Sequence, residues 1–282
     1  MKIAAAQIKL KTADFKYNFD NIVKYIENTD ADIIVFPSAD LEDLGAKDLC
    51  RDTKCLMQQL DFYERIAEKN YDKAVLIGDI LIRDGRAQDV EAFEINGKKI
   101  FVSETFRDDV ICDLYILAKN RYFAMNTYKD FVESIQPKSD FLYINAIGMA
   151  DENIFAGGSF AKNKHNELVM QMPLCIEAVE TVDFSKIVDF IDEPMEKQVY
   201  EVIKFALHEY CENTGFKKVI LGLSGGIDSA LTAALAVDSL GAENVFGIMM
   251  PSMYSSEGSV NDSLKLAQNL GIKTAKHTIT PS

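Results

Sequence analysis

Leu221-Gly222-Leu223-Ser224-Gly225-Gly226-Ile227-Asp228-Ser229 is the stretch that decides the fold of the C-terminal part of this chain. It follows an apolar, strand-like run at 217–221 and precedes a helical run at 230–240. Two adjacent glycines, which lack Cβ atoms, let the backbone turn tightly and bring several N–H groups close to one anion. The following helix would point the positive end of its dipole at the same place. The stretch therefore predicts a pyrophosphate-binding loop.

The polar side chains of this loop suit a magnesium-bound triphosphate. Asp228 offers a carboxylate for Mg²⁺, and Ser224 and Ser229 offer hydroxyl donors, which a glycine turn made only for packing would not need. A Walker A loop would add a lysine on the phosphates, but no lysine stands between Lys218 and Lys265. The dinucleotide fingerprint G-x-G-x-x-G does not fit these glycines either. Kinase-like, GTPase-like and Rossmann-type dinucleotide functions are therefore disfavoured.

The segment 224–229 resembles the SGG-x-DS signature of the ATP pyrophosphatases, which activate a carboxylate or carbonyl as an adenylate and release pyrophosphate. Residues 245–252, Tyr254-Ser255-Ser256 and 259–271 are similar to the NAD synthetases in particular. The resemblance implies ATP and Mg²⁺ as cofactors, with Asp228 at the metal. The residues that it places at the nucleotide are Gly222, Leu223, Ser224, Gly225, Gly226, Ile227, Asp228, Ser229, Met249, Met250 and Pro251.

The C-terminal unit alternates strand and helix. Strand-like runs at 217–223, 244–250 and 272–280 are separated by helical patterns at 229–240 and 259–270. Short links between them predict a Rossmann-like, parallel α/β unit with the loop at the carboxyl ends of the strands. Three strands in about 65 residues are marginal as a domain, and the family pattern continues beyond this point. We expect a fragment or ordered portion of a longer protein, with second-substrate residues in the absent part.

Composition narrows the class of protein. The chain has 282 residues, enough for two domains, and 44 acidic against 30 basic residues, for a net charge of −14. No basic face for nucleic acid or an anionic membrane is expected. The 5 cysteines show no C-x-x-C spacing, and no apolar stretch reaches about 18 residues. These features predict a cytoplasmic protein without disulfides, and the resemblance implies a homo-oligomer.

The N-terminal unit also alternates strands and helices. Strand-like runs at 2–8, 33–36 and 74–82 accompany a helical pattern at 17–26. Residues 90–95 and 100–105 predict a hairpin that turns at Asn96-Gly97, and later runs add more strands. An α/β sandwich is predicted. The expected domains are 1–186 and 196–282, joined by a linker at 187–195 that contains Pro194 and several acids.

This unit resembles the nitrilase-type amidase domain that supplies ammonia in glutamine-dependent NAD synthetases. The resemblance is carried by 2–7, 31–37 and 143–160, including Phe155-Ala156-Gly157-Gly158-Ser159-Phe160. Such amidases use a cysteine nucleophile, a glutamate base and a lysine that stabilises the oxyanion. The resemblance therefore implies three catalytic positions to inspect in this sequence.

The catalytic positions depart from the family pattern. Ser38 follows Phe36-Pro37 where the family has glutamate, and too few residues separate Thr105 from Asp113 to contain the lysine loop. Ser103 occupies the cysteine position in one register and Cys112 in another, and both registers stay open. Cys112 also fits an ordinary buried cysteine. The charge-rich residues 40–51 are interpreted as a solvated helix face.

These observations predict an NAD synthetase. MgATP would adenylate the nicotinate carboxylate of nicotinic acid adenine dinucleotide, and ammonia would displace AMP. Because the amidase triad is incomplete, free ammonia is the expected nitrogen donor and the amidase-like domain an inactive one. Two alternatives remain: a glutamine-hydrolysing enzyme that uses Cys112, and a non-catalytic ATP-binding fragment.

Overall fold

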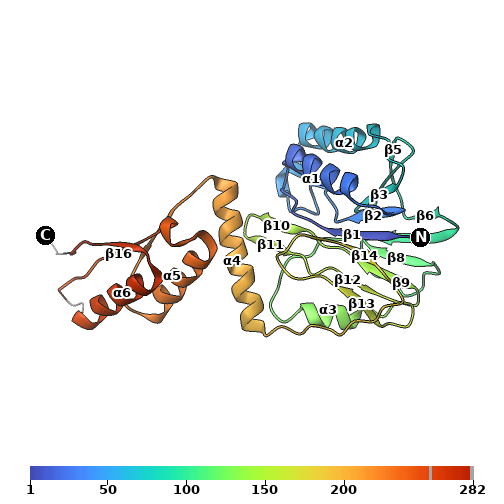
Figure 1. The fold of residues 1–282 in the computed structure, drawn as a ribbon. Helices are drawn as coiled ribbons and strands as arrows, with labels where there is room; N and C mark the ends of the chain where they lie inside the picture. Colours follow the sequence, from blue (N-terminus) through green and yellow to red (C-terminus); the bar gives the residue numbers. More distant parts are fainter. Residues whose placement is uncertain (254–255, 280–282) are drawn as a thin grey trace. The chain divides into compact units, whose positions relative to one another are not determined.

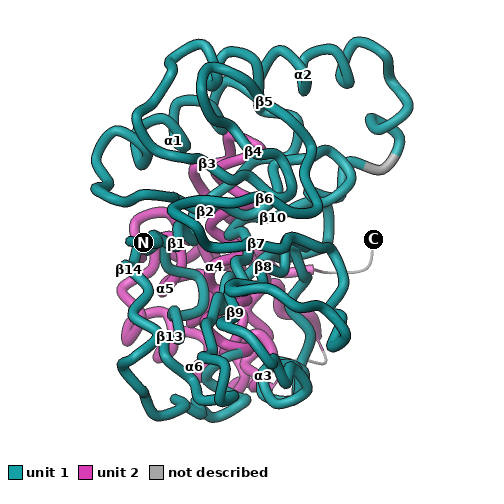
Figure 2. Tube along the Cα trace, turned by 90° about the vertical axis from the view of Figure 1, so that its right-hand side faces the viewer, with its two compact units in different colours: residues 1–198 teal, residues 199–282 magenta. Residues whose placement is uncertain are grey.

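The computed structural model describes residues 1–253 and 256–279. Tyr254 and Ser255, which belong to the NAD synthetase resemblance, and the end of the third expected strand at 280 lie outside these ranges. Contacts divide the chain into two compact units, residues 1–198 and 199–282, which Figure 2 colours separately. The domain limits at 186 and 196 stay a prediction. Each unit is described by itself below.

Unit 1 is built on two main sheets. The first has the order β14-β1-β2-β3-β4-β5 and the second the order β13-β12-β9-β8-β7-β6. The strands of the first sheet are β1 (Ile3–Gln7), β2 (Ile33–Phe36), β3 (Ala74–Ile77), β4 (Ile80–Arg83), β5 (Arg86–Asp89) and β14 (Ala178–Val182). The strands of the second are β6 (Ala92–Ile95), β7 (Lys98–Ser103), β8 (Leu114–Leu117), β9 (Asp140–Tyr143), β12 (Phe160–Lys162) and β13 (Leu168–Gln171). A separate hairpin joins β10 (Ile147–Ala150) to β11 (Asn153–Ala156).

The two sheets form a sandwich covered by helices. Helices α1 (Phe15–Asn28) and α2 (Thr53–Glu68) cover the first sheet, and α3 (Tyr128–Ser134) packs on the second (Figure 1). Along β1, Ile3 and Ala5 belong to one core, whereas Ala4 and Ala6 belong to the core beneath the helices. This alternation follows from the period of two in a strand. Burial on both faces explains why β2 and β3 are apolar throughout, and β1 as far as Ala6. The predicted α/β sandwich is confirmed.

Two turns in unit 1 join neighbouring antiparallel strands. The predicted hairpin at Asn96-Gly97 is confirmed, with φ values of 51° and 71° that suit Asn and Gly. The single strand expected at 74–82 is wrong, because the chain reverses at Gly78, where φ is 60°. β3 and β4 pair antiparallel with Ile77 opposite Ile80. The sequence does not reveal this turn, because the residues of β3 before it and of β4 after it are mostly apolar and buried.

Part of the segment expected as a linker at 187–195 lies along β13. The N–H of Val188 donates to the carbonyl of Leu168 at 2.9 Å, and the N–H of Ile191 donates to Oε1 of Gln171 at 2.8 Å. The ring of Phe190 stacks on Tyr128 with centroids 6.0 Å apart. At least 188–191 are thus packed on unit 1 rather than extended from it.

Unit 2 is a parallel sheet with helices, as predicted. It contains α4 (Met195–Thr214) from Val199 on, followed by β15 (Val219–Gly222), α5 (Ile227–Leu240), β16 (Val245–Met249), α6 (Glu257–Leu270) and β17 (Lys273–Lys276). The strands run parallel in the order β15-β16-β17. Short 3₁₀ turns lie at Lys47–Arg51 in unit 1 and Ala242–Asn244 in unit 2. No helix among the described residues is both long enough and apolar enough to cross a membrane.

Candidate functional site

The glycine loop connects β15 to α5 at the carboxyl edge of the sheet. The N–H of Leu223 donates to the carbonyl of Ile248 at 2.8 Å, so the chain leaves the sheet only at Ser224. The side chain of Leu223 is buried and belongs to the core of unit 2. Ligands of open α/β sheets bind at this edge.

The two serines hold the loop closed. The N–H of Ser224 donates to Oγ of Ser229 at 3.2 Å, and the two hydroxyl oxygens are 3.0 Å apart. The N–H of Gly226 donates to Oγ of Ser224 at 3.2 Å, and Oγ of Ser229 donates to the carbonyl of Gly226 at 3.0 Å. The loop is therefore ordered by its own side chains before a ligand enters.

The two glycines have different roles. Gly225 has φ of 79°, and a Cβ there would lie 2.4 Å from the carbonyl oxygen of Ser259 at the start of α6. Gly226 has an ordinary φ of −93°, and a Cβ would meet only Oγ of Ser224, at 3.4 Å. The fold itself requires glycine at 225. At 226 the bare backbone leaves room outside the loop for a ligand.

The N-terminus of α5 is open to an anion. Gly226 is its N-cap and provides no side-chain hydrogen bond, whereas Ser256 caps α6 through the N–H of Ser259. The first N–H groups of a helix have no partner within the helix. Together with the dipole, these donors suit a phosphate oxygen.

Asp228 lies in the first turn of α5 and is exposed. No group of three or more His, Cys, Asp or Glu side chains that could hold a metal occurs in the described ranges. A single carboxylate is nevertheless sufficient for Mg²⁺ that arrives with a nucleotide, because this ion is commonly bound by one or two carboxylates plus substrate phosphates. The donor set fits Mg²⁺ carried by ATP.

Of the other residues expected at the nucleotide, Met249 has its side chain in the core and offers only its backbone to the edge. Met250 is 52% exposed, and Ile227 is exposed beside the loop. The carbonyl of Pro251 accepts the N–H of Ile279 at 2.9 Å. The N–H of His277 likewise donates to the carbonyl of Met249 at 2.8 Å, so the segments after β16 and β17 lie side by side.

In unit 1, Ser38 follows β2 and meets the segment that follows β8. It is 1% exposed, its Oγ accepts the N–H of Asp40 at 3.3 Å, and its carbonyl accepts Nδ2 of Asn120 at 2.8 Å. Strands β2 and β8 belong to different sheets, and the hydrogen bond between Asn120 and Ser38 joins the segments that follow their carboxyl ends. The hydroxyl of Ser38 lies in the core rather than on an open site.

Ser103 is the last residue of β7, so it lies at the carboxyl edge of the second sheet. Cys112 lies at the opposite edge, before the first residue of β8. Oγ of Ser103 donates to the carbonyl of Thr105 at 3.0 Å. Cys112 precedes β8, and its Sγ lies 3.4 Å from Oγ of Ser139, which precedes β9. Ser103 pairs with Leu117 at the far end of β8, and the four-residue strand spans about 10 Å. Burial raises the pKa of the Cys112 thiol, which disfavours the nucleophilic thiolate.

Charged side chains occupy the region around Ser38. Nζ of Lys119 pairs with Asp43, whose side chain is 7% exposed, and with Glu104 at 3.3 Å. Burial raises the pKa of Asp40 to about 6, although the hydroxyl of Tyr63, 2.7 Å from Oδ1, opposes the shift. The interpretation of 40–51 as a solvated helix face is wrong for its first part, because 41–45 form turns and Asp43 is buried.

Comparison with known proteins supports both resemblances. Residues 199–282 match the NAD synthase family model. The glutamine-dependent NAD(+) synthetase of Synechocystis sp. is 42% identical over a match that covers 50% of this chain and 26% of that protein. The enzyme of the same name from Aquifex aeolicus is 26% identical, over 97% of this chain and 65% of that protein. The chain therefore matches less than two thirds of the length of these relatives.

Solved structures agree on the fold. Glutamine-dependent NAD+ synthetase from Acinetobacter baumannii, in complex with adenosine diphosphate, aligns over 99% of this chain and 65% of its own, with a TM-score of 0.87 and 23% identity. An amidase from Nesterenkonia sp. aligns over 65% of this chain and 89% of its own, with a TM-score of 0.54 and 12% identity. The chain thus carries an NAD synthase domain at 199–282, preceded by a nitrilase-type amidase fold, and resembles the glutamine-dependent NAD synthetases along its length.

Proposed function

We propose that the protein is an ATP-dependent ligase, or part of one, that converts nicotinic acid adenine dinucleotide to NAD. The single observation that carries this proposal is the braced SGG-x-DS loop at the open N-terminus of α5, inside a segment that matches the NAD synthase family. The nicotinate carboxylate attacks the α-phosphate of ATP, which forms an adenylate and releases pyrophosphate. Ammonia then attacks the carboxyl carbon, and AMP leaves.

In this proposal the loop 222–229 binds the β- and γ-phosphates and stabilises them as pyrophosphate leaves. Its N–H donors and the dipole of α5 act on the charge that develops on the leaving group. Asp228 holds Mg²⁺, which neutralises the phosphates. Met250 and the backbone of Met249 and Pro251 lie at the same sheet edge, where they border the adenine or ribose.

For the nitrogen source we propose free ammonia. Support comes from the region around Ser38, where a buried hydroxyl stands at the position of the base, and from the Lys119–Asp43 ion pair in the adjoining segments. Cys112 precedes β8, at the edge opposite the one that Ser103 occupies. A thiol, a base and an oxyanion donor are thus not assembled by these candidates.

A glutamine-dependent enzyme is the second candidate. The relatives in the comparison are glutamine-dependent NAD(+) synthetases, which favours glutamine as the donor. In this alternative Cys112 would be the nucleophile, and its mutation would abolish glutamine use while ammonium use remained. The third possibility, an ATP-binding protein without turnover, would bind MgATP but form no AMP.

The test is NAD formation from nicotinic acid adenine dinucleotide and MgATP by the protein expressed from the whole reading frame. Ammonium and glutamine are supplied in parallel reactions, and Cys112→Ala is assayed beside the unmodified protein. Turnover with ammonium alone supports the proposal. Equal turnover with glutamine, lost in Cys112→Ala, supports the second candidate, and MgATP binding without AMP supports the third.

A further inference from the structure

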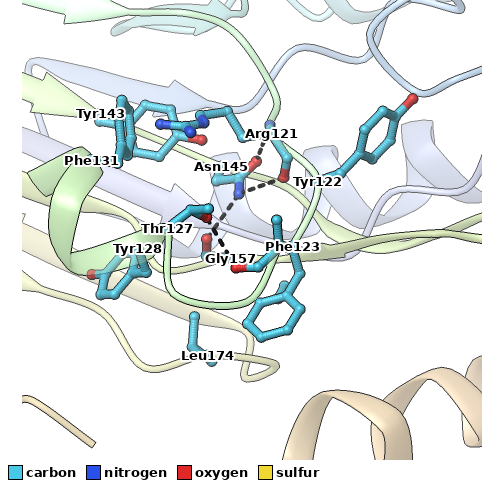
Figure 3. Close-up of a pocket in the computed structure, with 12 residues that line it drawn as sticks. Arg121, Tyr122, Phe123, Thr127, Tyr128, Phe131, Tyr143, Asn145, Gly157 and Leu174 are labelled. Carbon is cyan, nitrogen blue, oxygen red and sulfur yellow. Dashed lines mark hydrogen bonds between the residues drawn. The ribbon is translucent and has the colours of Figure 1, made fainter. Parts of the chain in front are cut away.

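A small cavity in unit 1 lies beside the segment that follows β8, apart from Ser38, Ser103 and Cys112. Its volume is about 40 Å³, and its lining includes Arg121, Thr127, Tyr143, Asn145 and Gly157. Three further lining residues, Tyr122, Ala124 and Thr127, are exposed, so the cavity opens to solvent on their side. Figure 3 shows the residues that line the cavity, with Arg121 and Tyr143 close to Phe131. A space of this size holds about two or three waters, or one planar group such as a carboxylate.

Arg121 brings a positive charge to this cavity. Its guanidinium carbon lies 3.5 Å from the centroid of the Phe131 ring, so the plane of the group is held against an aromatic face. Among the described residues, no carboxylate lies within ion-pair distance of it, whereas Arg107 pairs with Glu91 and Asp109. A guanidinium presents a planar fork of donors that matches a carboxylate.

Asn145 fixes the position of Arg121. Its Oδ1 accepts the backbone N–H of Arg121 at 3.0 Å, and its Nδ2 donates to the carbonyl of Arg121 at 3.1 Å and to that of Gly157 at 2.8 Å. Asn145 is 4% exposed. Both backbone polar groups of Arg121 are therefore satisfied, and the side chain alone remains to bind something else.

Tyr143 adds a neutral donor. The residue is 2% exposed and lines the cavity, and its hydroxyl has no hydrogen-bond partner within the described part of the chain. A buried hydroxyl without a hydrogen-bond partner destabilises the folded protein. Burial raises the pKa of this hydroxyl well above its usual range, so it is a donor at neutral pH. A bound acceptor would satisfy it.

We propose that this cavity is a binding site for a small carboxylate, held by Arg121 and Tyr143. The chain has a net charge of −14, so its overall charge repels an anion. An anion therefore binds only where local donors such as these are placed. The carboxylate belongs either to a free small acid or to the end of a longer ligand whose remainder extends past the exposed residues Tyr122, Ala124 and Thr127. The site involves no residue of the glycine loop, so it stands or falls independently of the ligase proposal.

Calorimetric titration of the purified protein with acetate and with glutamate tests the proposal, at constant ionic strength with chloride as the blank. Arg121→Gln and Tyr143→Phe should each weaken binding about tenfold or more, because a charge-assisted or buried hydrogen bond is lost. Arg65→Gln is the matched control for Arg121, since Arg65 also lies over an aromatic ring, that of Phe19 at 4.4 Å. Tyr71→Phe is the control for Tyr143, because the hydroxyl of Tyr71 is also buried without a partner.

Binding of acetate alone would identify a free small acid, and tighter binding of glutamate would identify the end of a longer ligand. Either result supports the proposal when both test variants lose binding and both controls keep it. Absence of binding by both anions in the millimolar range overturns it, as does binding that Tyr143→Phe leaves unchanged. Because Tyr143→Phe keeps the ring, this variant decides the question if Arg121→Gln does not fold.

Discussion

Gly225 and Gly226 are neighbours in sequence, but the packing of the fold constrains Gly225 and not Gly226. At Gly225 the positive φ and the backbone of Ser259 exclude any side chain, so the folded state demands glycine. At Gly226 neither the dihedral angle nor a neighbour forbids a methyl group. If the loop binds phosphate, only the ligand explains the glycine at this position.

We therefore expect Gly225→Ala and Gly226→Ala to separate stability from binding. Gly225→Ala should lower the free energy of unfolding of unit 2 by at least about 2 kcal/mol, from backbone strain and overlap. Gly226→Ala should change it by less than about 0.5 kcal/mol but weaken MgATP binding about tenfold or more. Urea unfolding and calorimetric titration measure the two quantities. Equal MgATP affinity in Gly226→Ala and the unmodified protein would contradict the assignment of the loop.

Asp40 makes the stability of unit 1 depend on pH. Its pKa is about 6 in the folded protein against 3.8 for an ordinary Asp, mainly because it is buried. The folded protein therefore holds the proton more tightly than the unfolded chain does. The stabilisation is present below about pH 4 and is lost as pH rises through about 6, and it amounts to at most about 3 kcal/mol.

Asp40→Asn should remove this dependence while its side-chain oxygen still accepts the hydrogen bonds of Tyr63 and Gln59. Between pH 4 and pH 7, the free energy of unfolding of the unmodified protein should fall relative to that of Asp40→Asn. Urea titrations at several pH values measure the difference. Asp84→Asn, which changes an exposed side chain, is the control. A constant difference between Asp40→Asn and the unmodified protein across this range would show that Asp40 does not titrate there.

At the scale of elements, one ion pair helps to join the carboxyl ends of β2 and β8. Asp43 lies in the turns after β2, and Lys119 follows β8 in the other sheet. Since the carboxylate is buried, removal of the lysine leaves a charge without its partner. The ion pair therefore links the segment after β2 to the segment after β8.

Lys119→Met should destabilise unit 1 by about 1–3 kcal/mol, because the buried side chain of Asp43 loses its ion-pair partner. The double variant Asp43→Asn with Lys119→Met should recover a large part of that loss. Thermal and urea unfolding of the two single variants and the double variant give the coupling between the residues. Simple addition of the two single effects would mean that the pair does not couple the two sheets.

Some elements of this fold can be predicted from local sequence and others cannot. The hairpin at Asn96-Gly97 and the parallel unit around the glycine loop follow from turn residues and from alternation of strand and helix. The turn at Gly78 was hidden because β3 and β4 are both apolar, and α3 and the β10–β11 hairpin were missed because they are short. Periodicity cannot separate a long buried strand from two short ones.

At the scale of the whole molecule, the loop could be found from sequence because its residues are consecutive. The amidase-like region could not, because Ser38 meets Asn120, and Asp43 meets Lys119, only when the two sheets face each other. The same holds for the cavity of Arg121 and Tyr143, which come from separate segments. The placement of Cys112 before β8, away from Ser103, likewise needed the parallel register of β7 and β8.

The proposed ligase has an ATP pyrophosphatase loop in unit 2, and its amidase-like unit does not supply the nitrogen. The most direct measurement is NAD formation from nicotinic acid adenine dinucleotide and MgATP, with ammonium in one reaction and glutamine in the other. We expect NAD and AMP to form in equal amounts with ammonium and no NAD to form with glutamine. NAD formation with glutamine at the rate seen with ammonium would contradict the claim.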